Sequence, residues 1–474
     1  MSKEQINKFL IQNSDKSIVV VQGLGFVGAV MSIVVANSDQ NEYAVIGIDL
    51  PEKKNVIDDL NNGIFPIQTT DVKVYEYFEN ARKRGNFLAT SNPYAYQNAD
   101  VVIVDINLDV QKESSVSRDL LNYDVSLEGF KKAMETIAKK CKEEALILVE
   151  TTVPPGTCQK IIKPIFEKAF EERGLEISFS IGHSYERVMP GPGYVDSIKN
   201  FYRVYSGIDE KSADKVELFL KTIISTDDYP LTRLGNTNAT EMSKVLENSF
   251  RAMNIAFIQE WTEFAESAGV DLYEVINAIR MRPTHNNIMR PGLGVGGYCL
   301  TKDPLLASWA SQNLFDSIRL TQSEAAVKIN DKMPSHTYKH IVSEVGENLS
   351  GKNILILGIS YLQNVGDTRY SPVELLFERL TNSKGKITIH DPFVEYWAEK
   401  GIPTLKNDQI HSQVFDIIII GTPHDEYVKN GLLEKVLTDN KGSLVIDPHG
   451  CLDDEFINKF KVNHNFKIIG RGDV

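Results

Sequence analysis

Short apolar runs recur along the first third of the chain, and stretches with helical spacing separate them. Four of these runs predict buried strands, namely SIVVVQ, YAVIGIDL, ADVVIVDI and ALILVETT in chain order. The stretch before the fourth run, SLEGFKKAMETIAKKCKEE, has the spacing of an amphipathic helix. Strands that alternate with helices in this way predict a parallel sheet covered on both faces. The segment 1–16 predicts a short amphipathic extension, with Ile6, Phe9 and Leu10 on one side.

A different pattern fills the middle of the chain. From about Asn238 to Ala268 the sequence has no glycine or proline, which predicts one long helix. The glycine-rich loop RPGLGVGGYCLTKDP follows at 290–304. After about residue 350, four more strands are expected in KNILILGIS, KITIHDP, DIIIIGT and SLVIDPHG. The predicted fold class is α/β, with two doubly wound parallel-sheet domains joined by a central long-helix segment.

Composition and charge narrow the function. The net charge of −13 argues against a protein that follows the phosphates of a nucleic acid. The apolar runs are too short to span a membrane, and the N-terminus lacks the apolar core of a signal peptide. The four cysteines are scattered without a CxxC pair, so neither a zinc site nor a disulfide framework is expected. A reducing cytoplasm is the expected compartment.

A dinucleotide motif follows the first predicted strand. Gly23, Gly25 and Gly28 form G-x-G-x-x-G at the start of a helix. The first glycine permits the tight turn, the second lets the backbone approach a pyrophosphate, and the third packs helix on strand. Asp49 ends the second strand, where a carboxylate binds the adenosine ribose and repels a 2′-phosphate. The motif therefore predicts NAD. FAD, or a glycine-rich turn without a ligand, are the alternatives.

Two cysteines compete as a candidate nucleophile. Cys299 lies in GVGGYCLTKDP, where glycines admit a substrate and Lys302 and Asp303 follow. A thiol can add to an aldehyde, and loss of hydride then gives a thioester that water releases as the acid. Cys158 follows TTVPPGT and is expected in the first turn of a helix, whose dipole would lower the thiol pKa. A buried core cysteine is the alternative for Cys299.

Polar residues elsewhere suit the same chemistry. Lys244 and Asn248 are four residues apart and share one face of the long helix, so both could donate to an oxyanion or a water. Glu186 and Arg187 follow a polar loop, and a glutamate in a cleft can act as a general base. An exposed polar surface is the alternative for both sets.

These motifs coincide with those of a known family. In order, GLGFVG, ETTVPPGT, ERVMPG, EMSKVLENSFRAMNIAFIQE, GVGGYC and GDTRYSP resemble the UDP-glucose/GDP-mannose dehydrogenase family, from about Ser17 to the C-terminal IIGRG. ERVMPG looks more like the UDP-N-acetylhexosamine 6-dehydrogenase branch. The resemblance implies a four-electron oxidation of a UDP-sugar with two NAD, and a homodimer joined through the central helix. After the extension at 1–16, it implies an NAD-binding Rossmann domain at 17–220, a central helical segment with the cysteine loop at 221–330, and a C-terminal UDP-sugar-binding domain at 331–474.

The resemblance also assigns roles to residues. It implies that Cys299 is the nucleophile and that Lys244 and Asn248 stabilise the oxyanion. Glu186, Asp303 and Thr152 are implied to handle the attacking water and protons, and no metal is implied. The implied cofactor contacts are Gly23, Gly25, Phe26, Val27, Gly28, Asp49 and Thr152. The implied substrate contacts are Glu186, Arg187, Val188, Lys244, Asn248, Arg290, Gly296, Tyr298, Leu362 and Arg369.

Three positions depart from the family pattern. Tyr298 stands where a histidine or serine usually precedes the nucleophile, and Leu362 stands where a lysine commonly contacts substrate. DINLDV replaces the Pro-Thr-Pro turn after the third strand. Arg369 or backbone N–H groups are expected to offset the missing lysine. The alternatives are a UDP-glucose 6-dehydrogenase, a two-electron hydroxyacid dehydrogenase, and a silent protein that binds NAD and a nucleotide sugar.

Overall fold

The computed structural model describes residues 1–67, 69–115, 120–188, 191–410 and 413–474, and backbone contacts divide the chain into two compact units. Unit 1 consists of Met1–Gln111, Asp124–Leu246 and Leu306–Arg319. Unit 2 consists of Lys112–Tyr123, Glu247–Leu305 and Leu320–Val474. The chain passes from one unit to the other several times, so neither unit is one continuous segment.

The sheet of unit 1 has eight strands: β1 (Ser17–Gln22), β2 (Tyr43–Ile48), β3 (Phe87–Thr90), β4 (Val101–Val104), β7 (Leu146–Val149), β8 (Ser180–His183), β9 (Val204–Gly207) and β10 (Thr232–Arg233). Their order across the sheet is β10-β9-β8-β7-β4-β1-β2-β3. Neighbours are parallel except β8 and β9, which pair antiparallel. Every residue of β2, β4 and β7 is buried, as a sheet covered on both faces requires.

The strand order identifies the site-bearing edge of this sheet. The predicted strands are confirmed as β1, β2, β4 and β7, and the run from β3 through β2, β1, β4 and β7 to β8 has the order of a Rossmann fold. The order reverses between β1 and β4, whose carboxyl ends lie side by side because Gln22 pairs with Val104. Ligands of open α/β sheets bind at such a reversal.

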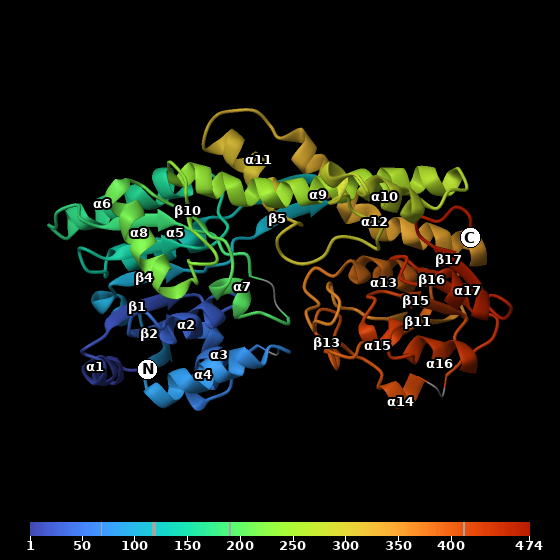
Figure 1. The fold of residues 1–474 in the computed structure, drawn as a ribbon, viewed down its shortest axis with the longest axis horizontal. Coiled ribbons are helices and arrows are strands. Elements are labelled where there is room, and N and C mark those ends of the chain that lie inside the picture. The colour runs from blue at the N-terminus through green and yellow to red at the C-terminus, as the bar shows by residue number, and fades with distance from the viewer. Residues whose placement is uncertain (68, 116–119, 189–190, 411–412) are drawn as a thin grey trace. The chain divides into compact units, whose positions relative to one another are not determined.

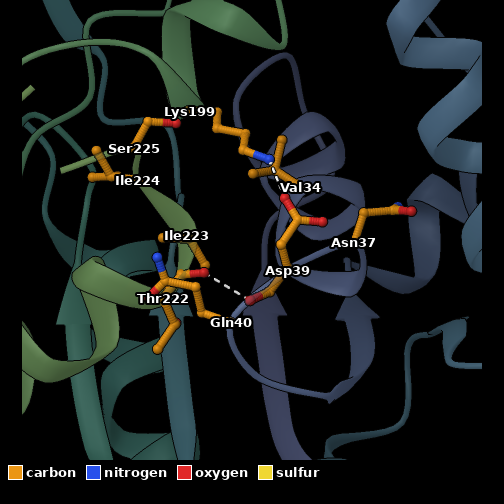
Figure 2. A pocket seen from close by; sticks show the side chains of 10 residues that line it. Val34, Asn37, Asp39, Gln40, Lys199, Thr222, Ile223, Ile224 and Ser225 are labelled. Atoms are coloured by element: carbon orange, nitrogen blue, oxygen red, sulfur yellow. Dashed lines mark hydrogen bonds and ion pairs between the residues drawn. The ribbon is translucent and has the colours of Figure 1, made fainter. Parts of the chain in front are cut away.

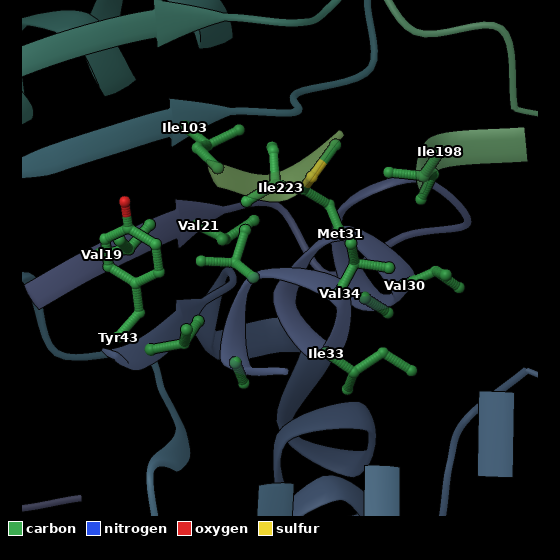
Figure 3. Packing of buried hydrophobic residues seen from close by; sticks show 14 of the residues in the cluster. Val19, Val21, Val30, Met31, Ile33, Val34, Tyr43, Ile103, Ile198 and Ile223 are labelled. Atoms are coloured by element: carbon green, nitrogen blue, oxygen red, sulfur yellow. The ribbon is translucent and has the colours of Figure 1, made fainter. Parts of the chain in front are cut away.

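Helix α2 (Gly28–Ala36) follows β1 and anchors the glycine-rich turn. All nine of its residues are buried, because the helix is apolar on every side and fits between the sheet and other helices. Met31, Ile33 and Val34 pack in one core with Val19 and Val21 of β1 (Figure 3). The turn before α2 is thus fixed at both ends by buried apolar elements.

The other helices of unit 1 cover the sheet or extend from it. The predicted amphipathic extension forms a helix with Ile6 and Phe9 buried, and Ser2 and Gln5 close a capping box at its start. These helices are α1 (Lys3–Gln12), α3 (Lys54–Asn62), α4 (Val72–Arg84), α5 (Glu128–Ala138), α6 (Lys163–Glu172), α7 (Asp196–Lys199) and α8 (Glu210–Ile223), with short turns at Pro51–Lys53 and Pro93–Asn98 and a π-helical turn at Cys158–Ile162.

The predicted long helix is confirmed as α9 (Thr237–Ser267), which is uninterrupted in Figure 1. Its residues up to Leu246 belong to unit 1 and those from Glu247 belong to unit 2. Asp271 caps the next helix, α10 (Leu272–Arg280), by accepting from the N–H groups of Tyr273 and Glu274. Two further helices follow: α11 (Asp303–Asn313), most of which belongs to unit 1, and α12 (Thr321–Val345), which belongs to unit 2.

The sheet of unit 2 has five parallel strands: β11 (Asn353–Leu357), β12 (Lys386–His390), β15 (Ile417–Ile420), β16 (Leu444–Asp447) and β17 (Asn465–Ile468). Their order is β12-β11-β15-β16-β17, so the four predicted strands are confirmed and β17 is additional. Alternate residues feed two cores: Ile418 and Ile420 face one, and Ile417 and Ile419 face the other. The order reverses between β11 and β15, which gives this sheet its own ligand-binding edge.

Short elements complete the described chain. They are α13 (Pro372–Asn382), α14 (Asn407–Ile410), α15 (Asp425–Val428), α16 (Leu432–Asp439), α17 (Asp454–Phe460), the short turn Pro283–His285, and the strand pairs β5 (Val110–Ser114) with β6 (Leu120–Val125) and β13 (Tyr396–Trp397) with β14 (Ile402–Pro403). Among the residues with described positions, no helix combines the length and apolar character that crossing a membrane requires. The expected α/β class with two Rossmann-like sheets and a long central helix is confirmed.

Candidate active site

The three motif glycines lie in different surroundings at the end of β1. A Cβ on Gly23, whose φ is +99°, would be 2.2 Å from the backbone oxygen of Asp105. A Cβ on Gly28 would be 1.9 Å from the backbone oxygen of Gly23. A Cβ on Gly25 would have no described atom within 4 Å. The protein's own packing therefore requires the first and third glycines, whereas the second faces open space that a pyrophosphate can occupy.

The neighbouring groups suit a dinucleotide. Val27 is the N-cap of α2, and among the described residues no side chain caps this helix, so its N–H groups point toward the turn. Phe26 keeps its place in the turn because its carbonyl accepts a hydrogen bond from the Tyr194 hydroxyl. Asp49 follows β2, and its two oxygens accept from the N–H groups of Leu24 (2.9 Å) and Leu50 (2.7 Å). The carboxylate is held beside the turn and keeps lone pairs for ribose hydroxyls.

A buried acidic cluster lies along the same edge. Asp105 follows β4 and Glu150 follows β7, and Glu150 forms a buried ion pair of 3.0 Å with Arg203. Burial raises the pKa of Glu150 to about 7, although the Arg203 guanidinium lowers it. Burial, and then Glu150 and Glu186, raise the pKa of Asp105 well above its usual range. The edge therefore holds carboxyl groups that can carry protons near neutral pH.

Sequence reasoning did not single out this cluster. Asp105 comes from the unusual DINLDV turn, and its only sequence signal was an acidic residue directly after a predicted strand. Thr152, which was expected to handle water and protons, is half-buried in the segment after β7. Its neighbour Thr151 closes the turn by donating to the Val104 carbonyl (3.0 Å) and accepting from the Ile106 N–H (2.8 Å).

Glu186 and Lys244 come together within unit 1. The Lys244 ammonium donates to the backbone oxygen of Glu186 (2.9 Å) and lies 3.9 Å from its carboxylate. Both side chains are largely buried, with 8% and 13% exposure. The Glu186 carboxylate also accepts from the N–H of Val188, which fixes the loop after β8. A buried glutamate carboxylate paired with a lysine ammonium is an arrangement that can act as a general base.

The Arg187 side chain forms hydrogen bonds with Tyr202 and Tyr185. Its guanidinium donates to the Tyr202 carbonyl (2.8 Å) and the Tyr185 hydroxyl (3.2 Å). Tyr185 in turn lies within hydrogen-bond distance of Ser243 (2.9 Å). His183, at the end of β8, is fully buried, and burial lowers its pKa to about 3, so its ring is neutral. Aromatic and hydrogen-bond contacts thus hold the ERV stretch in place.

The expectation for Cys158 is wrong in its physical premise. Cys158 does begin a helical turn, but the thiol is fully buried. The Glu241 carboxylate occupies the helix terminus, where it accepts from the N–H groups of Gly156 (2.6 Å) and Cys158 (2.8 Å). Burial and the nearby carboxylate raise the pKa of the Cys158 thiol well above its usual range instead of lowering it. A sealed, protonated thiol is a poor nucleophile.

Cys299, in contrast, is exposed on the glycine-rich loop of unit 2. Its backbone oxygen accepts from the N–H groups of Lys302 (3.2 Å) and Asp303 (2.9 Å), so the thiol sits on the turn that starts α11. Thr301 tightens the same turn by donating to the Gly297 carbonyl (3.0 Å). The accessible thiol is thus presented on a rigid, hydrogen-bonded turn.

Three polar side chains are buried beneath this turn. Asp303 accepts from the Asn248 amide (2.6 Å) and from the Lys302 ammonium (2.9 Å). Its side chain has no exposed surface, and that of Lys302 is 6% exposed. Buried polar groups need all their partners, so this arrangement fixes the orientation of the Asn248 amide. Lys302 was noted in the sequence only as a neighbour, and its ammonium also lies 4.4 Å from the Tyr298 ring centre.

The glycines before Cys299 allow a close contact with Tyr361. A Cβ on Gly296 would be 2.6 Å from the Tyr361 Cβ, and one on Gly297 would be 2.8 Å from its ring. Tyr298 packs at 6.0 Å, ring centre to ring centre, against Tyr370. Burial and Asp367 raise the pKa of Tyr361 to about 12, so its hydroxyl stays protonated. The ring of Tyr298 therefore packs against another aromatic ring, which accounts for a tyrosine at this position of the loop.

The other residues expected to contact the substrate are either exposed or already bound to protein groups. Leu362 is 43% exposed in the segment after β11. Arg369 forms a two-pronged ion pair with Asp367, at 2.9 and 2.7 Å, which partly neutralises the cation expected to replace the missing lysine. Arg290 is exposed and donates to Asn277 of α10 (2.9 Å). Arg369 and Arg290 both donate to protein groups, which leaves less positive charge for a substrate than the sequence suggested.

A second ligand-binding edge lies where β11 and β15 end. Gly358, with φ +89°, follows β11 and would place a Cβ 2.6 Å from Thr422, so the two turns touch. Asp391 accepts from the N–H groups of Ile359 (2.9 Å) and Ser360 (3.2 Å) and faces His424 at 3.2 Å. The segment with Leu362 leaves from this edge.

A pocket in unit 1 lies away from these groups. It is lined at the C-terminal end of α2 by residues including Asn37, Asp39, Lys199 and Thr222, as Figure 2 shows. Lys199 pairs with Asp39 across it at 2.6 Å. The glycine-rich turn is at the opposite end of α2, so this pocket is not the dinucleotide site.

Comparison with known proteins identifies the family of this chain. Three models of the UDP-glucose/GDP-mannose dehydrogenase family match the chain in order: the NAD binding domain at 17–224, the central domain at 238–332 and the UDP binding domain at 355–454. A curated UDP-N-acetyl-D-mannosamine dehydrogenase from Pyrococcus horikoshii is 29% identical over 462 residues, which cover 96% of this chain and 100% of the relative.

Solved structures agree in fold. A structure described as the UDP-D-ManNAc dehydrogenase of Pyrococcus horikoshii matches with a TM-score of 0.78 and 27% identity, covering 96% of this chain and 100% of that one. A UDP-glucose dehydrogenase from Pyrobaculum islandicum matches with a TM-score of 0.77 and 21% identity, covering 97% and 98%, which shows the shared fold alone.

Fold, site and comparisons together define an NAD-dependent nucleotide-sugar dehydrogenase. The chain belongs to the UDP-glucose/GDP-mannose dehydrogenase family, and the predicted resemblance is confirmed. Its cofactor is NAD, as the glycine-rich turn and Asp49 predicted.

Proposed function

We propose that this enzyme oxidises the 6-hydroxyl of a UDP-N-acetylhexosamine to a carboxylate, with UDP-N-acetylmannosamine as the first substrate to test. The observation that carries the proposal is the contrast between two thiols. Cys299 is exposed on the glycine-rich turn, whereas Cys158 is sealed against Glu241. An accessible thiol allows oxidation past the aldehyde, because it can hold the carbonyl carbon as a thioester.

The groups at the end of β1 fit NAD. Gly25 leaves room for the pyrophosphate, the start of α2 offers N–H groups to it, and Asp49 accepts from ribose hydroxyls. When bound, NAD accepts the hydride in each oxidation. The Asp49 carboxylate would repel a 2′-phosphate, which excludes NADP as the preferred cofactor.

The proposed reaction balances with two oxidations and one hydrolysis. The alcohol first loses a hydride and a proton to become an aldehyde. The Cys299 sulfur adds to the aldehyde carbon, and the resulting thiohemiacetal loses a second hydride and a proton to become a thioester. Water then breaks the C–S bond and releases the carboxylate, a proton and the free thiol. One alcohol and one water therefore yield one carboxylate, two transferred hydrides and three protons.

Other residues would handle charge and protons around this sequence. We assign Lys244 and Asn248 to the oxygen that becomes negative when sulfur or water attacks, because both side chains are N–H donors with buried, fixed partners. Glu186, buried beside Lys244, is assigned as the base for the hydrolytic water. Asp303 holds the Asn248 amide in position, and Thr152 is assigned to proton handling after β7.

The sugar assignment rests on two kinds of support. ERVMPG resembles the hexosamine branch, and the Pyrococcus horikoshii relative is described as acting on UDP-N-acetylmannosamine. UDP-glucose is the alternative substrate, and a silent binder is the alternative without chemistry. The departures at Tyr298 and Leu362 change substrate contacts in unit 2, while Cys299, Lys244, Asn248 and Glu186 are retained. Cys299 must also stay reduced, which suits the proposed cytoplasmic location.

A panel of nucleotide sugars tests the proposal. UDP-glucose, UDP-N-acetylglucosamine, its galacto and manno epimers, and GDP-mannose are each incubated with the enzyme and NAD, and the sugar acid is sought by mass spectrometry. Acid from an N-acetylhexosamine is expected. Acid from UDP-glucose alone would keep the chemistry and overturn the hexosamine assignment. Binding of NAD and a nucleotide sugar without any acid would favour the silent binder.

We also propose that the enzyme is a homodimer joined through α9. Phe250, Phe257, Trp261 and Phe264 lie on one face of this helix and are 46–63% exposed. The rings of Phe257, Trp261 and Phe264 contact one another in turn at 6.1 and 5.9 Å. A continuous aromatic stripe of this kind is costly in water and suits a self-complementary interface.

Light scattering coupled to size exclusion tests the dimer. Phe257→Glu is expected to shift the enzyme to a monomer, because it places a charge in the centre of the stripe. Val462→Glu is the matched control, since Val462 is 85% exposed outside the stripe. A Phe257→Glu variant that keeps the mass of a dimer would contradict the assignment of this face.

A further inference from the structure

Two histidines and a glutamate of unit 2 converge on one point outside the candidate active site. His336 and His340 lie one turn apart on α12, and Glu266 lies near the end of α9. The Glu266 Oε2 atom is 2.7 Å from Nε2 of His336 and 2.9 Å from Nε2 of His340. The two Nε2 atoms are only 3.3 Å apart. All three potential ligand atoms therefore face the same small volume.

The spacing of these atoms fits a tetrahedral metal ion. At a zinc–nitrogen distance of about 2.0–2.1 Å, two tetrahedral ligands lie about 3.3–3.4 Å apart, which is the separation of the two Nε2 atoms. The carboxylate oxygen would move outward by about half an ångström to reach the same spacing. The two rings pack edge to face, with ring centres 4.7 Å apart and planes at 87°, and this packing holds the two Nε2 atoms close together.

Surrounding groups hold the three side chains in this orientation. The other oxygen of Glu266 accepts from the N–H of Gly470 (2.7 Å), in the segment after β17. The Glu263 carboxylate lies 3.8 Å from Nδ1 of His336, the nitrogen that faces away from the centre. Carboxylates and backbone groups that orient metal-binding side chains in this way are typical of metal sites. His336 and Glu266 are about nine-tenths buried, whereas His340 is 25% exposed and leaves an approach open.

We propose that Glu266, His336 and His340 bind a divalent transition metal of the zinc type, with a water as the fourth ligand. Two nitrogens and one carboxylate oxygen form a donor set that zinc accepts, and an octahedral all-oxygen ion such as Mg²⁺ would not choose it. The metal would join α9, α12 and the C-terminal segment at Gly470 within unit 2. Because these elements are already in place, the expected role is structural stabilisation, separate from the oxidation.

Zinc binding by the full-length protein tests the proposal. Cys299→Ala is used as the background, so that the exposed thiol does not compete for the ion. After removal of metals with a chelator, about one equivalent of zinc is expected to be retained through gel filtration, with a raised melting temperature. Cobalt added as a spectroscopic substitute should give the visible absorption of a four-coordinate ion.

Substitutions locate the site. His340→Gln and His336→Gln should weaken zinc binding at least about tenfold, since loss of orienting groups alone costs about 10- to 100-fold. His285→Gln is the matched control, because His285 is an exposed histidine of unit 2 outside the cluster. Retention of no zinc by the background protein, an octahedral cobalt spectrum, or equal zinc affinity in the His340→Gln and His285→Gln variants would each overturn the proposal. The cobalt measurement decides the matter even if a histidine variant fails to fold.

Discussion

Replacing the motif glycines one at a time should separate folding from cofactor binding. A methyl group at Gly25 meets open space, and its φ lies outside the left-handed region. A methyl group at Gly28 would overlap the backbone oxygen of Gly23 at 1.9 Å. Gly25→Ala is therefore predicted to fold normally and lose NAD affinity, whereas Gly28→Ala is predicted to lose stability.

The magnitudes follow from these surroundings. At Gly25, alanine restricts the unfolded chain and should change stability by only about +0.4 to +1 kcal/mol. At Gly28, alanine gains about 1 kcal/mol of helix propensity, but it cannot avoid a backbone clash whose cost is about 1–3 kcal/mol or more. Blocked N–H contacts to a pyrophosphate should cost about 1.5–3 kcal/mol, which is about a 10- to 150-fold weaker NAD affinity in Gly25→Ala.

Two measurements check this prediction. Urea denaturation compares the unfolding midpoints of the variants without cofactor, and NADH fluorescence titration gives the dissociation constants. A Gly25→Ala protein that binds NADH as tightly as the wild type would refute the assignment of the open space to the pyrophosphate. A Gly28→Ala protein as stable as the wild type would refute the packing argument.

Three further substitutions test other features. Asp49→Asn should raise catalytic efficiency with NADP relative to NAD by about tenfold or more, because the repelling charge is removed, and steady-state kinetics with both cofactors measures this. Burial raises the pKa of Glu241 from 4.5 to about 7, so the folded state binds more protons than the unfolded state between these values. Wild-type stability should therefore fall as pH rises from about 4.5 to 7, and denaturant midpoints of Glu241→Gln should show a shallower slope, because Glu150 and Asp105 keep their own contributions. Leu362→Lys should lower the KM for the UDP-sugar by up to about tenfold with little change in kcat, and an unchanged KM would place Leu362 away from the substrate.

The sheets could be predicted where apolar runs are continuous. β2, β4 and β15 are buried along their length, and β1 is buried from Ile18 onward, so the apolar pattern is unambiguous. β8 was not predicted, because SIGH contains serine, glycine and histidine although every residue is buried. Its burial depends on β7 and β9, which pair with it on either side, and on α8, whose Val216 would lie 2.1 Å from a Cβ on Gly182. That information is tertiary and has no local pattern.

The site could be predicted where a motif carries its own geometry. The glycines lie in the turn itself, and Asp49 accepts a hydrogen bond from the N–H of Leu24 within it; their roles toward the cofactor stay a prediction. Cys158 failed because its environment depends on Glu241, 83 residues away, which occupies the helix terminus and buries the thiol. The pairing of Arg203 with Glu150 was missed for the same reason.

The histidine cluster has only a partial signal in the sequence. His336 and His340 are four residues apart in a stretch with helical spacing, which places both on one face. The third member, Glu266, is 70 residues from His336, so only the folded chain reveals that it completes the set.

The ratio of NADH formed to sugar acid formed tests the central claim most directly. A thioester on Cys299 requires two hydride transfers before hydrolysis, so two NADH per carboxylate are predicted. NADH is followed by absorbance and the acid by mass spectrometry, with UDP-N-acetylmannosamine as substrate. The Cys299→Ala variant should form no carboxylate while still binding the nucleotide sugar, and Cys158→Ala should keep the ratio of two. A steady ratio of one with an aldehyde or ketone as the final product, or carboxylate formation by Cys299→Ala, would contradict the account.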